Sequence, residues 1–243
     1  MNMENIFELK NIIDQAENIV FFGGAGVSTA SGIPDFRSSK GLYNTSDTDD
    51  APEAILSSAY LYENSRKFFE YYRSNMVYPY AEPNDAHFAL AELERQGKLS
   101  CVITQNIDGL HQAAGSKNVI ELHGSVHRNY CVRCGKFHDL SHIINSDGIA
   151  RCTACGAMVR PDVVLYGESL NNEALTKAED AIYEADLLIV GGTSLNVFPA
   201  ASLVLDYIGE HLVIINQTPT RFDAYAELVL RDPICEVMSS LVN

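Results

Sequence analysis

The chain has 243 residues, 47% of them hydrophobic, and a formal charge of −15. Such a chain can build a core domain with a smaller satellite, and its composition argues against disorder. The negative charge disfavours nucleic acid and anionic membranes as partners. No apolar run approaches the ~18 residues of a membrane span, and the N-terminus lacks the apolar stretch of a signal peptide, so a cytoplasmic protein is expected.

The first half of the chain predicts the opening of an α/β fold. Residues 4–16 have helical apolar spacing, and NIVFF (18–22) is a short buried strand that ends in glycines. Residues 31–50 predict a long loop, and residues 52–76 an aromatic helical region. The next predicted elements are helix 84–96, strand 100–104, helix 109–114 and strand 118–122.

From 125 to 160, cysteines, basic residues and glycines replace the apolar runs, which indicates an inserted module. Afterwards the α/β alternation resumes. The predicted elements are strand 163–166, helix 171–184, strand 186–192, helix 199–208, strand 212–216 and strand 226–230. Continuous apolar strands that alternate with helices predict a parallel sheet covered on both faces.

Four cysteines in this module have the spacing of a zinc ribbon. Cys131 and Cys134 form one Cys-x-x-Cys pair, and Cys152 and Cys155 form another 17 residues later. Two such turns complete a tetrahedron of thiolates, so the predicted zinc site is closed and structural. Redox pairs and free buried thiols are weaker alternatives. A shell of three cysteines with His127 or His138 is also less favoured, since it leaves one cysteine idle.

A glycine turn follows the first strand. GGAGVSTASGIPDFR (23–37) places Gly-x-Gly after a strand, as dinucleotide-binding proteins do, but Thr29 replaces the third glycine. No acidic residue closes a second strand roughly 20 residues later. The turn therefore favours phosphate binding moderately. A tight strand-to-helix connection is the alternative.

Polar residues follow several predicted strands. TQNIDGLH (104–111), ELHGS (121–125), GGTSLNVFPA (191–200) and IINQT (214–218) all begin at strand ends. Because parallel strands end at one edge of a sheet, these segments predict a shared ligand site. The alternative for TQNIDGLH is a helix cap made by Asn106 or Asp108.

Together these segments resemble the sirtuin family of NAD-dependent protein deacylases. The matching stretches are GAGVSTASGIPDFR, TQNIDGLH, the HG at 123–124, the four cysteines, RPDVVLYGE (160–168) and GTSLNVFPA. The resemblance implies a Rossmann-type NAD-binding domain made of residues 1–38, 78–124 and 161–243. The helical insertion 39–77 and the zinc-ribbon insertion 125–160 would form the small domain.

The resemblance also implies which residues bind NAD. They are Ala25, Thr29 and Arg37 for the phosphates and nearby ribose; Phe36 for the nicotinamide end; Gln105, Asn106, Ile107 and Asp108 for the nicotinamide and ribose pocket; Thr193, Ser194 and Asn216 for the adenosine half; Asp232 by the adenine, from a loosely matching tail; and His123.

His123 would be the catalytic base. In the implied reaction, the acyl-lysine carbonyl oxygen attacks the nicotinamide ribose and nicotinamide leaves. A ribose hydroxyl then needs a base, and an imidazole near neutral pKa suits that proton transfer. The products are free lysine, nicotinamide and O-acyl-ADP-ribose. Segments 163–168 and 195–198 would hold the acylated protein substrate by main-chain pairing, and a monomer is expected.

Two departures from the family pattern concern the acyl group. Tyr166 stands where phenylalanine is usual. In relatives that prefer acidic acyl groups, a Tyr-x-x-Arg pair occurs, and FFEYYR places Phe69 and Tyr72 at those positions here. Neither can form an ion pair with a succinyl carboxylate. We therefore expect acetyl and longer neutral acyl groups to be preferred, although Arg73 lies only one position away.

Two other functions remain open from the sequence. A mono-ADP-ribosyltransferase would use the same NAD site, because both reactions begin with the release of nicotinamide. A non-catalytic zinc-ribbon binding module is the second alternative. The intact QNID and HG segments disfavour an inert scaffold.

Overall fold

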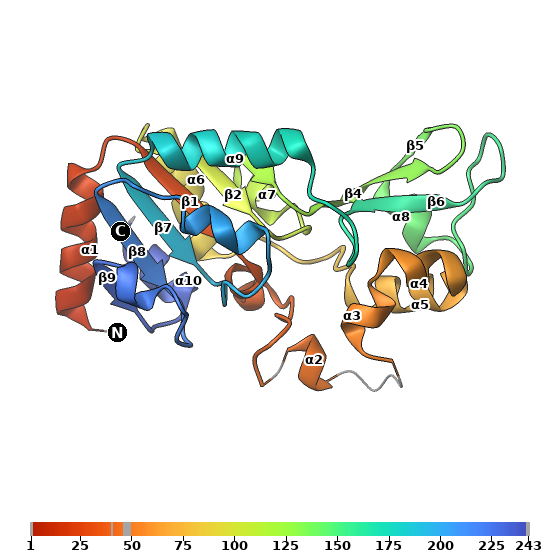
Figure 1. Ribbon diagram of the computed structural model, residues 1–243, viewed down its shortest axis with the longest axis horizontal. Helices are drawn as coiled ribbons and strands as arrows, with labels where there is room; N and C mark the ends of the chain where they lie inside the picture. Colours follow the sequence, from red (N-terminus) through yellow and green to blue (C-terminus); the bar gives the residue numbers. More distant parts are fainter. Residues whose placement is uncertain (1, 40, 46–49, 242–243) are drawn as a thin grey trace.

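The computed structural model describes residues 2–39, 41–45 and 50–241. Its larger part is built on a six-stranded parallel sheet, and its smaller part combines a three-stranded antiparallel sheet with short helices (Figure 1). The helix that begins at Met3 and the helix that ends at Ser239 both lie in the larger part. The expected α/β architecture is thus confirmed. No helix within the described ranges is long and apolar enough to cross a bilayer.

The parallel sheet has the strand order β3-β2-β1-β7-β8-β9. Its strands are β1 (Ile19–Gly23), β2 (Leu99–Thr104), β3 (Val119–Glu121), β7 (Leu187–Gly191), β8 (His211–Ile215) and β9 (Leu228–Leu230). The chain runs outward from β1 in one direction to β3 and then in the other from β7 to β9. Ligands bind such sheets at this reversal, beyond the carboxyl ends of the strands.

Helices cover both faces of this sheet, as the buried strands require. α1 (Met3–Gln15), α6 (Asp85–Arg95) and α10 (Ile234–Ser239) pack on one face around a core that includes Phe21. α9 (Asn172–Glu184) and the 3₁₀ helix Ala200–Val204 pack on the other face around Phe22. The short α7 (Leu110–Ala114) follows β2 and contacts α6.

The smaller part has its own apolar core. Its sheet order is β5-β4-β6, with β4 (Gly124–Cys131), β5 (Phe137–His138) and β6 (Val159–Val163). Its helices are α3 (Pro52–Ile55), α4 (Ser58–Glu63), α5 (Ser65–Asn75) and α8 (Leu140–Ile144), and α2 (Leu42–Thr45) precedes them in the chain. Phe68, Phe69 and Tyr72 of α5 are buried together with Val126 and Val159 of this sheet. The domain boundaries predicted after residue 124 and before residue 161 fall within this sheet, because Gly124 belongs to β4 and residues 161–163 belong to β6. The division into domains stays a prediction.

The predicted parallel strand at 163–166 is wrong. The strand here is β6, which covers residues 159–163 and pairs antiparallel with β4. Beyond β6, the side chain of Val164 packs against the core around Phe22, whereas Leu165 is buried in the core of the smaller part. Neighbouring residues of this apolar run therefore pack into two different cores. In the sequence, such a run looks the same as a single buried strand.

Three helical predictions also differ in detail. The predicted helix 199–208 is only the 3₁₀ helix Ala200–Val204. The helical region 52–76 is divided into three helices. The Ser57 side chain accepts a hydrogen bond from Tyr60 N and caps the start of the second, α4. The glycine turn after β1 leads into two 3₁₀ helices, Ala25–Val27 and Thr29–Ser31, instead of an α-helix. Within the predicted loop 31–50, α2 forms, while residues 40 and 46–49 lie outside the described residues.

Candidate functional site

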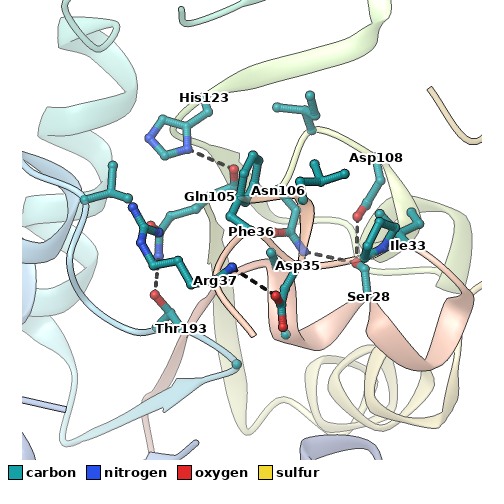
Figure 2. Close-up of a pocket in the computed structure, with 18 of the residues that line it drawn as sticks. Ser28, Ile33, Asp35, Phe36, Arg37, Gln105, Asn106, Asp108, His123 and Thr193 are labelled. Atoms are coloured by element: carbon teal, nitrogen blue, oxygen red, sulfur yellow. Dashed lines mark hydrogen bonds between the residues drawn. The ribbon is translucent and has the colours of Figure 1, made fainter. Parts of the chain in front are cut away.

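The carboxyl ends of five parallel strands meet at one cavity. The segments that follow β1, β2, β3, β7 and β8 all contribute lining residues. Figure 2 labels residues from the first four of these segments. The cavity holds about 470 Å³, which lies within the usual range for small-molecule sites. Segment 163–168 of the smaller part also lines it. The predicted convergence of polar strand ends on one ligand-sized space is therefore present.

Close contact between two turns explains the glycines after β1. Gly26 N donates to Gly192 O at 2.8 Å, and a Cβ on Gly26 would lie only 2.8 Å from the backbone of Gly192. A side chain there would force the two turns apart. The glycine pattern thus brings the turn that carries Ala25 and Thr29 against the end of β7, where both residues line the cavity.

A buried hydrogen-bond network organises the segment after β2. Asn106 Nδ2 donates to Ser28 Oγ at 3.0 Å, and Ser28 Oγ donates to Asp108 Oδ2 at 2.6 Å. The other oxygen of Asp108 accepts from Leu110 N, the first residue of α7, although the N-cap residue of that helix is Gly109. Ser28 was not singled out by the sequence, although it directly follows Gly-x-Gly-Val and is buried.

Gln105 links the ends of β2 and β7. Its Nε2 donates to Thr193 Oγ1 at 3.1 Å, and its backbone N–H donates to Gly23 O at 3.0 Å. The Thr193 hydroxyl oxygen also accepts from Leu195 N. These bonds hold three strand ends at fixed positions around the cavity.

His123 follows β3 and lines the cavity. Its Nδ1 lies 2.9 Å from Gln105 O (Figure 2). Because a carbonyl oxygen can only accept, Nδ1 carries the proton, and the neutral ring keeps its lone pair on Nε2. Burial lowers the pKa of His123 from its usual value of 6.5, and the bond to Gln105 only partly opposes this. The side chain is therefore a neutral imidazole with a free acceptor near pH 7.

His127 supports the same segment from β4. Its Nε2 lies 2.9 Å from Asp108 O, so the ring nitrogen donates to that carbonyl. Gly109 has a φ of +76°, and a Cβ there would lie 2.9 Å from the His127 ring. His127 was considered from the sequence only as a less favoured zinc ligand. In the structure it lies beside the Asp108 turn, because Val126 N of β4 donates to Ile107 O and holds the two segments together.

The loop after Pro34 places Phe36 and Arg37 at the cavity. The Asp35 carboxylate accepts from Arg37 N at 3.1 Å and from Ser38 N at 2.8 Å. The Phe36 ring packs 5.6 Å from the Tyr43 ring, and the Arg37 guanidinium lies 5.3 Å from the centre of that ring. Tyr43 thus supports both residues, although the sequence did not single it out.

Most of the predicted cofactor residues line this one cavity. They are Ala25, Thr29, Phe36, Arg37, Gln105, Asn106, Ile107, Asp108, His123, Thr193, Ser194 and Asn216. Asp232 is not among the lining residues of the described chain, whereas its neighbours Pro233, Ile234 and Cys235 are.

An apolar extension of the cavity reaches into the smaller part. Its lining includes Tyr72, Val126, Leu140, Val163 and Leu165. The Tyr72 hydroxyl is buried and has no hydrogen-bond partner, and burial raises the pKa of this phenol. This branch of the cavity therefore presents neutral surface.

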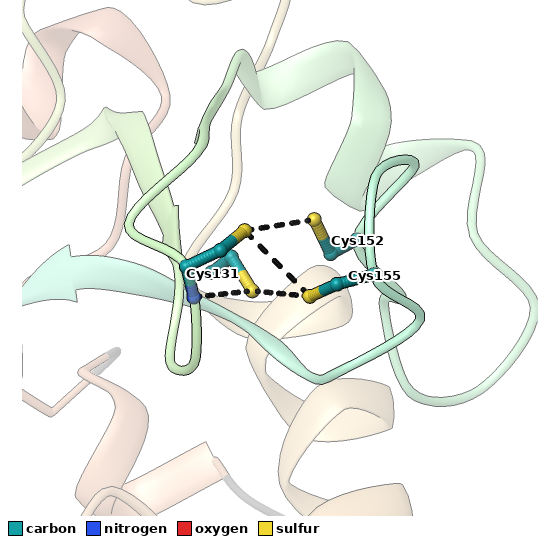
Figure 3. Close-up of side chains that lie close together, drawn as sticks. Cys131, Cys152 and Cys155 are labelled. Carbon is teal, nitrogen blue, oxygen red and sulfur yellow. Dashed lines mark hydrogen bonds between the residues drawn. The ribbon is translucent and has the colours of Figure 1, made fainter.

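The four cysteines of the ribbon form one cluster (Figure 3). Their Sγ atoms all lie within 4.8 Å of one another, and the contacts Cys131–Cys155, Cys155–Cys134 and Cys134–Cys152 measure 3.4, 3.6 and 3.7 Å. Thiolates about 2.3 Å from a tetrahedral zinc ion are about 3.8 Å apart, so the cluster fits zinc. No histidine joins this group within the described residues, which disfavours a shell of three cysteines and one histidine.

Comparison with known proteins gives consistent results. The Sir2 family model matches residues 24–199. The chain is similar to the NAD-dependent protein deacetylase of Clostridium perfringens, with 52% identity over 99% of both chains. It is also 54% identical to the protein of the same name from Cutibacterium acnes, over 96% of both chains.

Solved structures agree with these sequence matches. A structure described as "Structural Basis for the Mechanism and Regulation of Sir2 Enzymes" superposes with a TM-score of 0.90 at 38% identity, over 99% of this chain and 97% of that one. A Sir2 complex with a p53 peptide and NAD⁺ superposes with a TM-score of 0.86 at 38% identity, over 99% of this chain and 97% of that one.

Proposed function

This chain belongs to the Sir2 family, and from that membership we infer that it is an NAD-dependent protein-lysine deacetylase. The observation that carries this function is His123, a neutral imidazole that lines the cavity at the strand ends and is held by Gln105 O. The relatives named as deacetylases span the whole chain. Solved relatives include a complex with a deacetylated peptide and 3′-O-acetyl-ADP-ribose.

We propose that NAD occupies the cavity along the strand ends. The turn with Ala25 and Thr29, together with Arg37, would hold the phosphates and nearby ribose. Backbone N–H groups at a glycine turn and a guanidinium both suit phosphate oxygens. Phe36 would cover the nicotinamide end. When bound, NAD supplies the ADP-ribose that accepts the acyl group and the nicotinamide that leaves.

The segments after β2 and β7 would hold the other parts of NAD. The proposed residues are Gln105, Asn106, Ile107 and Asp108 around the nicotinamide ribose, and Thr193, Ser194 and Asn216 at the adenosine half. Ser28 would fix Asn106 and Asp108 through the hydrogen bonds that join them. The location of Asp232 outside the cavity lining weakens its proposed adenine contact.

His123 would accept the proton that a ribose hydroxyl releases. The donation from its Nδ1 to Gln105 O leaves Nε2 as the acceptor. The lowered pKa keeps the ring neutral at pH 7, which is the protonation state that a base requires. The bond to Gln105 O also fixes the ring orientation, so little reorganisation is needed for proton transfer.

The acylated lysine would enter between segments 163–168 and 195–198. Residues of both segments, including Tyr166 and Phe198, line the cavity. A strand-like peptide would pair with their main chains. The acyl group would enter the neutral branch beside Tyr72. Solved relatives bind acetylated and propionylated peptides.

The four cysteines would hold one structural zinc ion. Four thiolates complete the metal's shell, so zinc would stabilise the ribbon without taking part in the reaction. We further propose that the protein acts in the cytoplasm as a monomer and does not bind nucleic acid, which its charge of −15 supports.

Labelled NAD tests the reaction against protein ADP-ribosylation. The protein is incubated with an acetyl-lysine peptide and NAD labelled in the adenylate. Deacetylation predicts that the label appears in O-acetyl-ADP-ribose, with one nicotinamide released for each lysine freed. Label retained on protein would instead support the transferase, which the deacetylase names of the relatives disfavour. An absence of nicotinamide release with any acyl peptide would revive the binding module.

A further inference from the structure

Two tyrosines from distant parts of the chain meet beside the cavity. The hydroxyl oxygens of Tyr43 and Tyr166 lie 2.6 Å apart, a normal length for an O–H···O hydrogen bond. Tyr43 belongs to α2, in the loop that carries Phe36 and Arg37. Tyr166 belongs to segment 163–168, which lines the cavity from the smaller part. One hydrogen bond therefore joins the proposed cofactor loop to the proposed peptide segment.

Tyr43 is the residue that organises its loop. Its backbone N–H donates to Phe36 O at 3.0 Å, and its ring contacts both the Phe36 ring and the Arg37 guanidinium. A shift of the Tyr43 side chain would thus move both residues that are proposed to contact NAD from this loop. Burial, followed by the bond to Tyr166, raises the pKa of Tyr43, so the phenol stays protonated.

Tyr166 provides a fixed point for this loop. Its backbone N–H donates to Leu56 O, and its carbonyl accepts from Ser58 N, each at 3.0 Å. Two residues later, Glu168 pairs with Arg160 at 2.7 Å and accepts from the Ser58 hydroxyl at 3.0 Å. The backbone of Tyr166 is therefore held by the α3–α4 connection, and its hydroxyl extends from that support to Tyr43.

We propose that the Tyr43–Tyr166 hydroxyl pair is a positioning device that holds Phe36 and Arg37 in the geometry that binds NAD. Both tyrosines act through these two residues and not on the reacting atoms. The inference rests on the proposed NAD site.

The expected effect follows from the size of one hydrogen bond. A net contribution of this kind corresponds to about a two- to tenfold change in an equilibrium constant. Tyr166→Phe and Tyr43→Phe each remove one hydroxyl and keep the ring. Each should raise the KM for NAD by about two- to tenfold. In Tyr43→Phe, the kcat and the KM for the acetyl-lysine peptide should stay near their wild-type values, because Tyr43 is not among the lining residues of the described chain and His123 is untouched.

The double variant separates a coupled pair from two independent contacts. Once one hydroxyl is gone, the other has no partner in the pair, so the double variant should resemble either single variant. Tyr60→Phe is the matched control. It also removes a hydrogen bond of a phenol hydroxyl, to Asp50 at 2.9 Å. Within the described residues, no hydrogen bond joins Tyr60 to Phe36 or Arg37. Its KM for NAD should stay unchanged.

The dissociation constant for NAD, measured by titration calorimetry without peptide, makes the test independent of the reaction. If the wild-type protein binds NAD but does not deacetylate peptides, the proposed function fails while the pair can still be judged. The proposal about the pair is overturned if Tyr166→Phe leaves both the KM and the dissociation constant for NAD unchanged. Additive effects in the double variant, or an equal effect of Tyr60→Phe, would overturn it too.

Discussion

His123 shows how burial adapts one side chain to its proposed role. Its ring is held by Gln105 O, and burial lowers its pKa below 6.5. An exposed histidine of ordinary pKa would be partly protonated at neutral pH, so a fraction of the molecules would lack a base. The position after β3 therefore supplies both the orientation and the protonation state that the reaction needs.

The pH dependence of deacetylation should report this pKa. Protonation of His123 removes the base, so kcat/KM should rise with pH and reach its plateau early. Because the pKa is lowered, the midpoint of the acid limb should lie below 6.5. Initial rates with an acetyl-lysine peptide between pH 5 and 8 check this. A midpoint above 7 would contradict a buried, neutral His123.

Acyl selectivity should follow from Tyr72 and its surroundings. Tyr72 is buried and neutral, and the Arg73 guanidinium donates to Gly148 O instead of lining the cavity. A succinyl carboxylate would enter this branch without a cation, at a large desolvation cost. Its kcat/KM should be at least about tenfold below that of acetyl-lysine, the equivalent of ~1.4 kcal/mol. Comparable turnover of the two peptides would overturn this expectation.

At the scale of elements, the strands of the large sheet could be predicted because each is a continuous apolar run. The run at 163–166 looked the same, but Val164 and Leu165 serve different cores. The contact between Tyr43 and Tyr166 joins residues 123 positions apart. Sequence periodicity reports local burial, and it says nothing about such distant pairs.

The candidate site was predictable for a related reason. Polar residues directly after buried strands, such as Gln105 and Thr193, must meet where parallel strands end. The roles of Ser28 and His127 could not be predicted, because they depend on the path of the neighbouring segment. The prediction that Asp232 lies by the adenine came from a loosely matching C-terminal segment. In the structure its neighbour Pro233 lines the cavity, and Asp232 is not among the lining residues of the described chain.

The zinc ribbon is the element whose stability should depend on metal. Cys131 and Cys152 are buried in the core shared with α5, so loss of the metal should loosen that packing. Cys152→Ser should lower the bound zinc from one ion per chain to nearly none and reduce the Tm, because metal binding contributes folding free energy. Elemental analysis and thermal unfolding measure both effects.

His138→Gln is the control for the ligand assignment. This histidine lies in the ribbon, but it does not belong to the thiol cluster. The variant should keep one zinc ion per chain. If it lost as much zinc as Cys152→Ser does, a shell of three cysteines and one histidine would be the correct one.

For the molecule as a whole, two buried histidines should make stability depend on pH. His87 and His111 lie with ring centroids 4.8 Å apart between α6 and α7. Burial lowers the pKa of His87 to about 4 and that of His111 to about 3, from 6.5. Both rings are therefore neutral in the folded protein over a range in which the unfolded chain is protonated.

The free energy of unfolding should fall as the pH drops below 6.5. Between that value and the lowered pKa values, the unfolded state binds more protons, so acid favours unfolding. Each histidine contributes a slope of up to about 1.4 kcal/mol per pH unit. Urea unfolding at pH 7.5, 6 and 5 measures this. The variant His111→Asn should show a shallower slope, and an unchanged slope would contradict the assignment.

The central claim is that His123 performs the chemistry while the cysteines hold a separate structural zinc. The most direct measurement compares NAD-dependent deacetylation and zinc content in His123→Ala and in His142→Gln, which changes a half-buried ribbon histidine outside the thiol cluster. His123→Ala should reduce kcat by about 10²–10⁴-fold and retain one zinc ion per chain, while His142→Gln should keep both properties. Wild-type activity in His123→Ala, or loss of its zinc, would contradict the account.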